Sequence, residues 1–116
     1  MKADIFFCIS VESSDKIIIE RILATENLNM TLSVDSHGKF NYSSQKITMD
    51  FDDLGESILI FCKKFKLPNI SYVSHNVLGY VQVLVYSIKN DVNFFISNEL
   101  ASILSRNGFG LDIHHK

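Results

Sequence analysis

Hydrophobic residues change their spacing several times along the chain, and each spacing is typical of one kind of secondary structure. The segment DIFFCISV, residues 4–11, is apolar at nearly every position and rich in aromatic and β-branched residues. Such a run, which does not alternate cleanly, predicts a central strand covered on both faces. Residues 15–25 then place apolar side chains at helical spacing, at Ile18, Ile19, Ile22 and Leu23. They predict an amphipathic helix with Ser13 or Ser14 as its N-cap.

A period of two begins at residue 28 and predicts a β-hairpin. Apolar and polar residues alternate there as Leu28, Asn29, Met30, Thr31, Leu32, Ser33, Val34 and Asp35. This is the pattern of a strand with one solvated face. Gly38 supplies the positive φ that the following turn needs, and the chain returns through residues 39–51. We expect an irregularity in this returning strand at residues 43–45.

The middle of the chain predicts a second helix followed by a strong strand. Asp52 or Asp53 can cap the helix, and with Asp53 as the cap Glu56 occupies the third helical position. One apolar stripe contains Leu54, Ile58, Phe61, Cys62 and Phe65, and Pro68 ends the element. Residues 79–88, GYVQVLVYSI, form the strongest strand pattern, and KND then predicts a turn before a short strand, VNFFI, at residues 92–96.

The end of the chain, FFISNELASILSRNGFGLDIHHK, predicts one more helix and an edge strand. Ser97 is the expected N-cap, Gly108 the left-handed helix end, and residues 111–114 the strand. The predicted order is therefore β-α-β-β-α-β-β-α-β in a single domain of residues 1–116. Strands that pair as hairpins, with three helices too few to cover both faces of a sheet, indicate an α+β fold. We expect a mostly antiparallel sheet with the helices mostly on one side.

Composition narrows the classes of function. The net charge is −2 and the pI is near 6.0, whereas a dedicated nucleic-acid-binding domain is usually strongly basic. The apolar runs are too short for a membrane span, and Glu12 and Asp15 come too early for a signal peptide. These features predict a cytoplasmic protein that binds neither nucleic acid nor membrane. Cys8 and Cys62 lie in apolar runs and are expected to be reduced core residues.

No motif in the sequence indicates catalysis. The four histidines show neither the helical i, i+4 spacing nor the Cys/His spacing of zinc sites. Neither cysteine has the electropositive surroundings of a thiol nucleophile, and NGFG at residues 107–110 is typical of a helix end. We therefore predict no catalytic residue, no metal and no cofactor, and we assign no chemistry to the terminal pair His114 and His115.

The one concentration of charge of interest is acidic and contains Asp50, Asp52, Asp53 and Glu56. One interpretation is a helix N-terminus, whose dipole favours anions. The other is an acidic surface that meets a basic partner, where complementary charge accelerates association. The two interpretations are compatible. The polar side of the alternating strand, residues 29–35, is likewise either a solvated face or a flat platform for a protein partner.

The final segment resembles the close of a family of small bacterial α+β domains that includes immunity proteins of contact-dependent growth-inhibition systems. The matching residues are Ile96, Ser97, Glu99, Leu100, Leu104, Leu111, Asp112 and Ile113. The opening strand and helix are compatible with the same family. The resemblance implies a non-catalytic protein that neutralises a cognate toxin, commonly a nuclease delivered from a neighbouring cell.

The sequence thus leads to one functional hypothesis and one alternative. The hypothesis is an immunity protein that covers the active site or substrate surface of its toxin. Its expected contact residues are the acidic side chains Asp35, Asp50, Asp52, Asp53 and Glu56 and the aromatic anchors Tyr42, Tyr72 and Tyr80. The alternative is a small regulatory or ligand-binding α+β domain.

Overall fold

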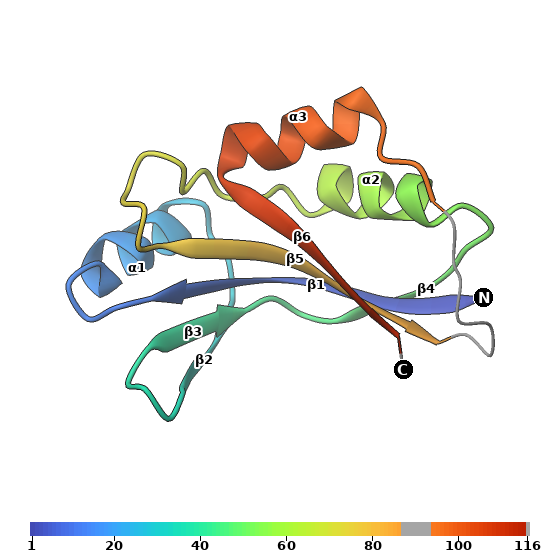
Figure 1. The fold of residues 1–116 in the computed structure, drawn as a ribbon. Coiled ribbons are helices and arrows are strands. Elements are labelled where there is room, and N and C mark those ends of the chain that lie inside the picture. The colour runs from blue at the N-terminus through green and yellow to red at the C-terminus, as the bar shows by residue number, and fades with distance from the viewer. Residues whose placement is uncertain (87–93, 116) are drawn as a thin grey trace.

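In the computed structural model, which describes residues 1–86 and 94–115, a twisted sheet carries helices on one side (Figure 1). The elements in chain order are β1 (Lys2–Val11), α1 (Lys16–Thr25), β2 (Thr31–Val34), β3 (Phe40–Ser43), β4 (Ile47–Asp50), α2 (Leu54–Lys64), β5 (Leu78–Tyr86), α3 (Asn98–Asn107) and β6 (Phe109–His115). None of the helices in the described part of the chain has the length and apolar composition that crossing a membrane requires.

The six strands form one mixed sheet in the order β2-β3-β1-β5-β6, with β4 also paired to β1. Every pairing within the described residues is antiparallel except β5 with β6, which α3 connects as a crossover. The predicted α+β class with a mostly antiparallel sheet is confirmed. Residues 111–114 were predicted as an edge strand, and they belong to β6 at one end of the sheet.

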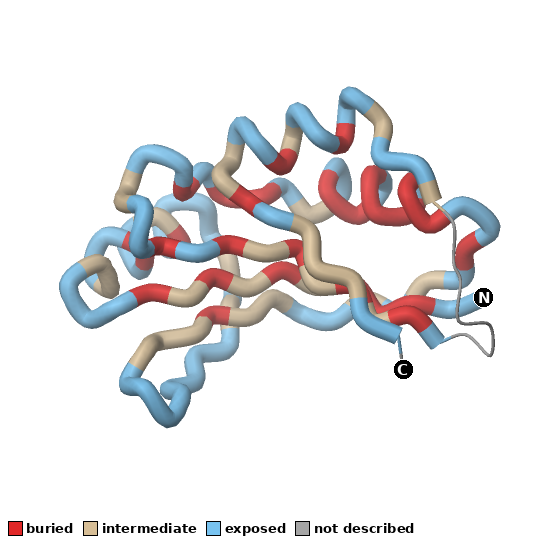
Figure 2. The backbone as a smooth tube through the Cα atoms, viewed as in Figure 1, coloured by how far each residue is buried: buried red, intermediate tan, exposed pale blue. Residues whose placement is uncertain are grey.

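One face of the sheet packs against the helices and holds the core. Its buried side chains on β1 and β5 are Ala3, Ile5, Phe7, Ile9, Val11, Val81, Val83 and Val85. Against them lie Ile19 and Leu23 of α1, Ile58 and Phe61 of α2, and Leu100 and Leu104 of α3. Figure 2 shows the resulting alternation of buried and less buried positions along β1 and β5.

The opposite side of the sheet, which we call the open face, carries no helix from the described residues. The prediction that β1 is central is correct, but the prediction that helices or strands cover both of its faces is wrong. Phe6 and Cys8 on the open face are only half-buried, by their cross-strand neighbours and by Lys46, whose ammonium lies 5.6 Å from the Phe6 ring centroid.

A β-bulge divides the returning strand of the predicted hairpin into β3 and β4. Cys8 pairs with Ser43 and Ile5 with Ile47, so the partner of β1 contains one extra residue between these pairs. The Phe7 amide donates to Ser44 Oγ at 2.9 Å, and the Ser44 amide donates to the Phe7 carbonyl at 2.9 Å. The expected irregularity at residues 43–45 is therefore confirmed.

The predicted helix ends are correct for two helices and wrong for one. Asp53 accepts a hydrogen bond from the Glu56 amide at 3.2 Å, Ser97 accepts one from the Leu100 amide at 3.1 Å, and Gly108 ends α3 with a φ of 82°. At α1 the N-cap is Asp15, without a side-chain cap, and not Ser13 or Ser14.

One further strand prediction is not met by the structure. The turn predicted at residues 89–91 and the start of the strand predicted at 92–96 lie outside the described residues. Residues 94–96 are described and form no strand. Within the described residues there is thus no strand between β5 and α3, and there is one more strand than predicted after β2, where the bulge splits the hairpin.

Candidate functional site

Four exposed carboxylates gather where β4 passes into α2. We call Asp50, Asp52, Asp53 and Glu56 the acidic end. The side chain of Phe51 between them is buried in the core, and its amide donates to the Met1 carbonyl at 2.8 Å. This buried anchor holds the loop in place, so the acidic side chains on both sides of it point to solvent.

An exposed aromatic ring lies beside the acidic end. Asp52, Asp53, Phe94 and Phe95 line an open hollow of about 450 Å³. The side chain of Phe94 packs against the core, whereas Phe95 is 77% exposed. A large apolar group left in water next to carboxylates is a typical feature of a contact surface.

Gly55, in the first turn of α2, allows the Phe95 segment to approach. A Cβ atom at this glycine would lie 2.0 Å from the Phe95 carbonyl oxygen, so only glycine fits. A salt bridge of 2.6 Å between Lys63 and Glu99 also joins α2 to α3. The position of Phe95 relative to the acidic end is therefore set by backbone packing.

The acidic end keeps its negative charge unpaired within the described residues. The ion pairs among the described residues join Lys16 to Glu20, Lys63 to Glu99 and Asp112 to His114, and none of them includes a residue of the acidic end. Lys2 stands opposite Asp50 in the β1–β4 register, but the two side chains form no ion pair. The dipole of α2 stabilises Asp53 and Glu56 at its N-terminus, so the helix-start interpretation of this acidic segment holds as well.

Asp35 was predicted to belong to the same contact surface, but the structure places it at the other end of the sheet. Phe40, after the β2–β3 turn, pairs with Val11, whereas Asp50 pairs with Lys2, at opposite ends of a strand about 30 Å long. Asp35 Oδ1 accepts hydrogen bonds from the amides of His37 at 2.8 Å and Lys39 at 3.1 Å. Chiefly because of the Lys39 amide, the pKa of this carboxyl lies below its ordinary value. Asp35 organises the turn.

The three tyrosines predicted as anchors lie apart from one another and from the acidic end. Tyr42 is only 4% exposed and lies under α1, where its hydroxyl donates to Glu20 Oε1 at 2.8 Å. Burial, and then Glu20, raise the pKa of this phenol. Tyr42 is a core residue and offers no ring to a partner, which corrects the prediction. Tyr72 is 69% exposed in the loop after α2, and Tyr80 is half-buried on the open face.

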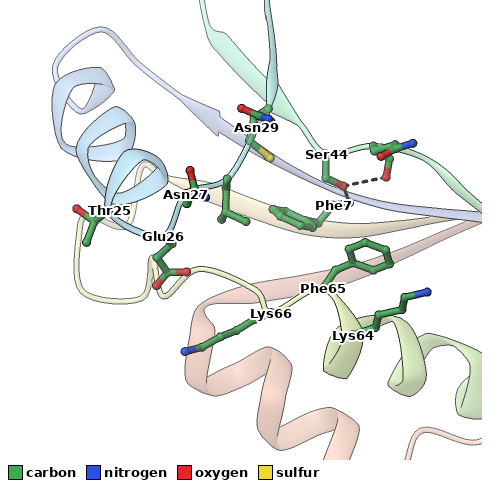
Figure 3. Close-up of a pocket in the computed structure, with 12 residues that line it drawn as sticks. Phe7, Thr25, Glu26, Asn27, Asn29, Ser44, Lys64, Phe65 and Lys66 are labelled. Atoms are coloured by element: carbon green, nitrogen blue, oxygen red, sulfur yellow. Dashed lines mark hydrogen bonds between the residues drawn. The ribbon is translucent and has the colours of Figure 1, made fainter.

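A second hollow, of about 540 Å³, opens beside the β-bulge (Figure 3). Its apolar lining comes from Phe7, Leu28, Met30 and Phe65, and its polar lining from Thr25, Glu26, Asn27, Asn29, Ser44, Gln45, Lys64 and Lys66. Figure 3 shows the rings of Phe7 and Phe65 at the centre, with the two lysine ammonium groups on opposite sides. This groove combines an apolar floor with hydrogen-bonding amides, which suits a small amphipathic molecule.

The cysteines and histidines do not assemble into a reactive cluster among the described residues. Cys62 is a buried core thiol whose pKa burial raises to about 12, and Cys8 is half-buried on the open face with a pKa raised chiefly by burial. His114 Nε2 lies 3.0 Å from Asp112 Oδ2. No group of three potential metal ligands is found in the described ranges.

No protein-family model, curated protein or solved structure matched this chain. The candidate site therefore depends on its own geometry. The sequence analysis found the acidic end but missed Phe95, which was read as part of a strand. A usable signal was present, because neighbouring residues of an extended segment point to opposite sides. Two consecutive phenylalanines, Phe94 and Phe95, could not both face the core.

Proposed function

We propose that this protein is an immunity protein that binds a cognate toxin domain, a nuclease, and covers its active site or substrate surface. The observation that supports the proposal is the exposure of Phe95 beside the four carboxylates of the acidic end. The resemblance of the final segment to immunity proteins agrees with it. In this proposal the acidic end contacts the toxin, and the protein performs no reaction itself.

The physical argument depends on charge complementarity. A nuclease binds phosphates through basic groups, so a cluster of carboxylates can occupy the same positions. Long-range attraction then accelerates association, and Phe95 supplies apolar area that is removed from water on binding. An interface of ordinary size, roughly 1,600 Å² in total, would extend beyond the acidic end onto neighbouring surface.

A charge-reversal experiment tests the proposal. The proposal requires a large exoprotein gene directly upstream of this one, and the probe is the C-terminal domain of that exoprotein. Asp52→Lys with Glu56→Lys should lower its association rate about 10- to 100-fold at low salt and weaken the salt dependence. The control is Glu12→Lys with Glu26→Lys, which changes net charge equally at exposed sites outside the acidic end. The proposal would be refuted if the two double variants lowered the association rate equally, or if wild-type protein did not bind the probe.

Phe95→Ala tests the aromatic part of the site. A central anchor should raise the dissociation rate of the complex, by about 30-fold for a loss of about 2 kcal/mol, with little change in the association rate. Tyr72→Ala is the control, because Tyr72 is comparably exposed but is not part of the acidic end. If Phe95→Ala and Tyr72→Ala dissociate at the wild-type rate, Phe95 is not a contact residue.

The groove beside the bulge favours a second candidate function, a small ligand-binding or regulatory domain. Its volume of about 540 Å³ falls within the usual size of small-molecule sites. A thermal-shift screen separates the two functions, because a ligand raises the melting temperature only if it binds the native state. Stabilisation of wild-type protein that is lost in Asn29→Trp, which fills the rim of the groove, would favour the second function.

A further inference from the structure

We propose that the protein forms a two-fold symmetric dimer by antiparallel pairing of β6 with β6 of a second copy. β6 ends the sheet and is paired on one side only, in parallel with β5. Along its other side, no strand of the described residues accepts or donates ladder hydrogen bonds. Such an edge is a template for a further strand. This inference does not depend on the proposed function.

Among the described strands, β2, β4 and β6 each have one edge without a paired strand, and these edges differ in how they are protected. β2 and β4 are each four residues long, and short edge strands discourage pairing with other chains. β6 is seven residues long and contains no proline or lysine. Its register with β5 runs without a bulge from the Gly79–Phe109 pair to the Val85–His115 pair. Within the described chain, β6 therefore offers the longest regular free edge.

Two-fold symmetry permits only a few registers, and charge selects among them. Side chains of β6 alternate, so Asp112 and His114 lie on the open face and Ile113 lies on the helix-covered face. A dimer centred on Asp112 would place two carboxylates opposite each other, and one centred on His114 would place two imidazoles opposite each other. Like charges directly opposite are destabilising in an antiparallel pair.

Centring the dimer on Ile113 makes the strand complementary to itself. Asp112 of each copy then faces His114 of the other, twice, and the two Ile113 side chains meet on the other face. Within one copy His114 Nε2 lies 3.0 Å from Asp112 Oδ2, and the two side chains are 57% and 42% exposed. In the dimer each side chain exchanges this contact within its own strand for the same contact with the other copy. An imidazole donates a hydrogen bond to a carboxylate in either protonation state.

The expected dimer is weak. In the Ile113-centred register only residues 111–115 of each copy face each other, which corresponds to an interface below about 1,000 Å². Sedimentation equilibrium at low salt from about 10 µM to about 1 mM should show the mass rising from monomer towards dimer. A wild-type protein that remains monomeric over this range overturns the proposal.

Charge swaps test the register. Asp112→His alone or His114→Asp alone replaces both complementary pairs by like pairs, and each should raise the dissociation constant about tenfold. The double variant Asp112→His/His114→Asp restores both pairs in the same register and should return the dissociation constant to the wild-type range. Circular dichroism confirms folding of each variant. The proposal is overturned if the single variants have the dissociation constant of wild type. It is also overturned if the double variant folds but its dissociation constant does not return to the wild-type range.

Amide hydrogen exchange of wild-type protein locates the interface without any variant. Exchange at residues 111–115 should slow as protein concentration rises, whereas exchange at the other edge, residues 31–34, should not change. Slowing confined to another part of the chain, or slowing at both edges alike, would show that a dimer forms by different contacts and would overturn the assignment to β6.

Discussion

The carbonyl oxygen of Phe95 lies 2.0 Å from the position that a Cβ atom on Gly55 would occupy. The first turn of α2 therefore has room for the segment before α3 only because residue 55 has no side chain. This close packing brings an exposed phenylalanine beside the carboxylates of the acidic end, although about 40 residues separate them in the sequence. Gly55 thus positions the proposed contact surface.

Gly55→Ala should disturb this packing. The added methyl group must displace the backbone at Phe95, and overpacking of this kind typically lowers the free energy of unfolding by about 1–3 kcal/mol. Urea denaturation measures the change. Gly110→Ala is the control, because the nearest atom to its Cβ, Tyr80 Cδ1, is 3.4 Å away, an ordinary contact. A stabilised Gly55→Ala, as helix propensity alone would give, contradicts the observed proximity.

Tyr42→Phe should destabilise the protein by removing the hydrogen bond between β3 and α1. The hydroxyl of Tyr42 donates to Glu20 Oε1 at 2.8 Å, and a hydrogen bond of this kind typically contributes about 1 kcal/mol. Thermal denaturation of both proteins measures the loss. Tyr72→Phe, at an exposed ring, should leave the melting temperature unchanged. Equal melting temperatures for Tyr42→Phe and wild type would show that water replaces the Tyr42–Glu20 bond without loss.

Glu20 should contribute to the pH dependence of stability. Hydrogen bonds from Lys16 and then Tyr42 lower the pKa of this carboxyl below its ordinary value. A carboxyl with a lowered pKa stabilises the fold above the pKa of the unfolded chain, about 4.3 for Glu, and loses that contribution as the pH falls through the native pKa. Melting temperatures below about pH 4.3 should therefore fall less steeply for Glu20→Gln than for wild type. Glu12→Gln, at an exposed residue, is the control and should keep the wild-type slope.

Thr48→Val should lower the free energy of unfolding, because it removes a hydrogen-bond donor to the buried carboxylate of Asp4. Asp4 lies in the sheet with only 6% exposure, and its carboxylate accepts hydrogen bonds from Thr48 Oγ1 at 2.6 Å and from the Tyr86 hydroxyl at 2.5 Å. Loss of one donor to a buried charged group typically costs about 1.5–3 kcal/mol of unfolding free energy. Urea denaturation measures this loss of unfolding free energy. The control is Thr31→Val, because Thr31 of β2 also lies on the open face of the sheet. Equal midpoints for the two variants would contradict this role.

The two thiols should differ in reactivity. Cys62 is buried in α2 with its pKa raised to about 12, so at neutral pH a disulfide reagent should modify it only after unfolding. Cys8 is half-buried on the open face and should react in the native protein, although more slowly than a free thiol because burial also raises its pKa. Labelling of native Cys8→Ser and Cys62→Ser proteins with Ellman's reagent assigns each rate. Rapid reaction of Cys62 in native Cys8→Ser protein would contradict its burial.

Local patterns were enough to predict much of the fold. Asp53, Ser97 and Gly108 were identified because a helix end is decided by the residues next to it. The acidic end was also found from sequence, because its four carboxylates lie within seven consecutive positions. The class α+β followed from hairpin spacing and the number of helices, and the structure confirms it.

The sequence by itself determined the described helices and most of the strands, since helical and strand patterns arise from neighbouring residues. It misassigned residues 94–96 as a strand and the open face of β1 as covered. Only the tertiary structure decided that Tyr42 is covered by α1, that Phe95 lies exposed beside the acidic end, and that β6 lies parallel to β5. Hydrophobicity records the preference of a side chain for burial, but not which distant element covers it. That outcome depends on backbone packing between segments far apart in the chain, as Gly55 and Phe95 show.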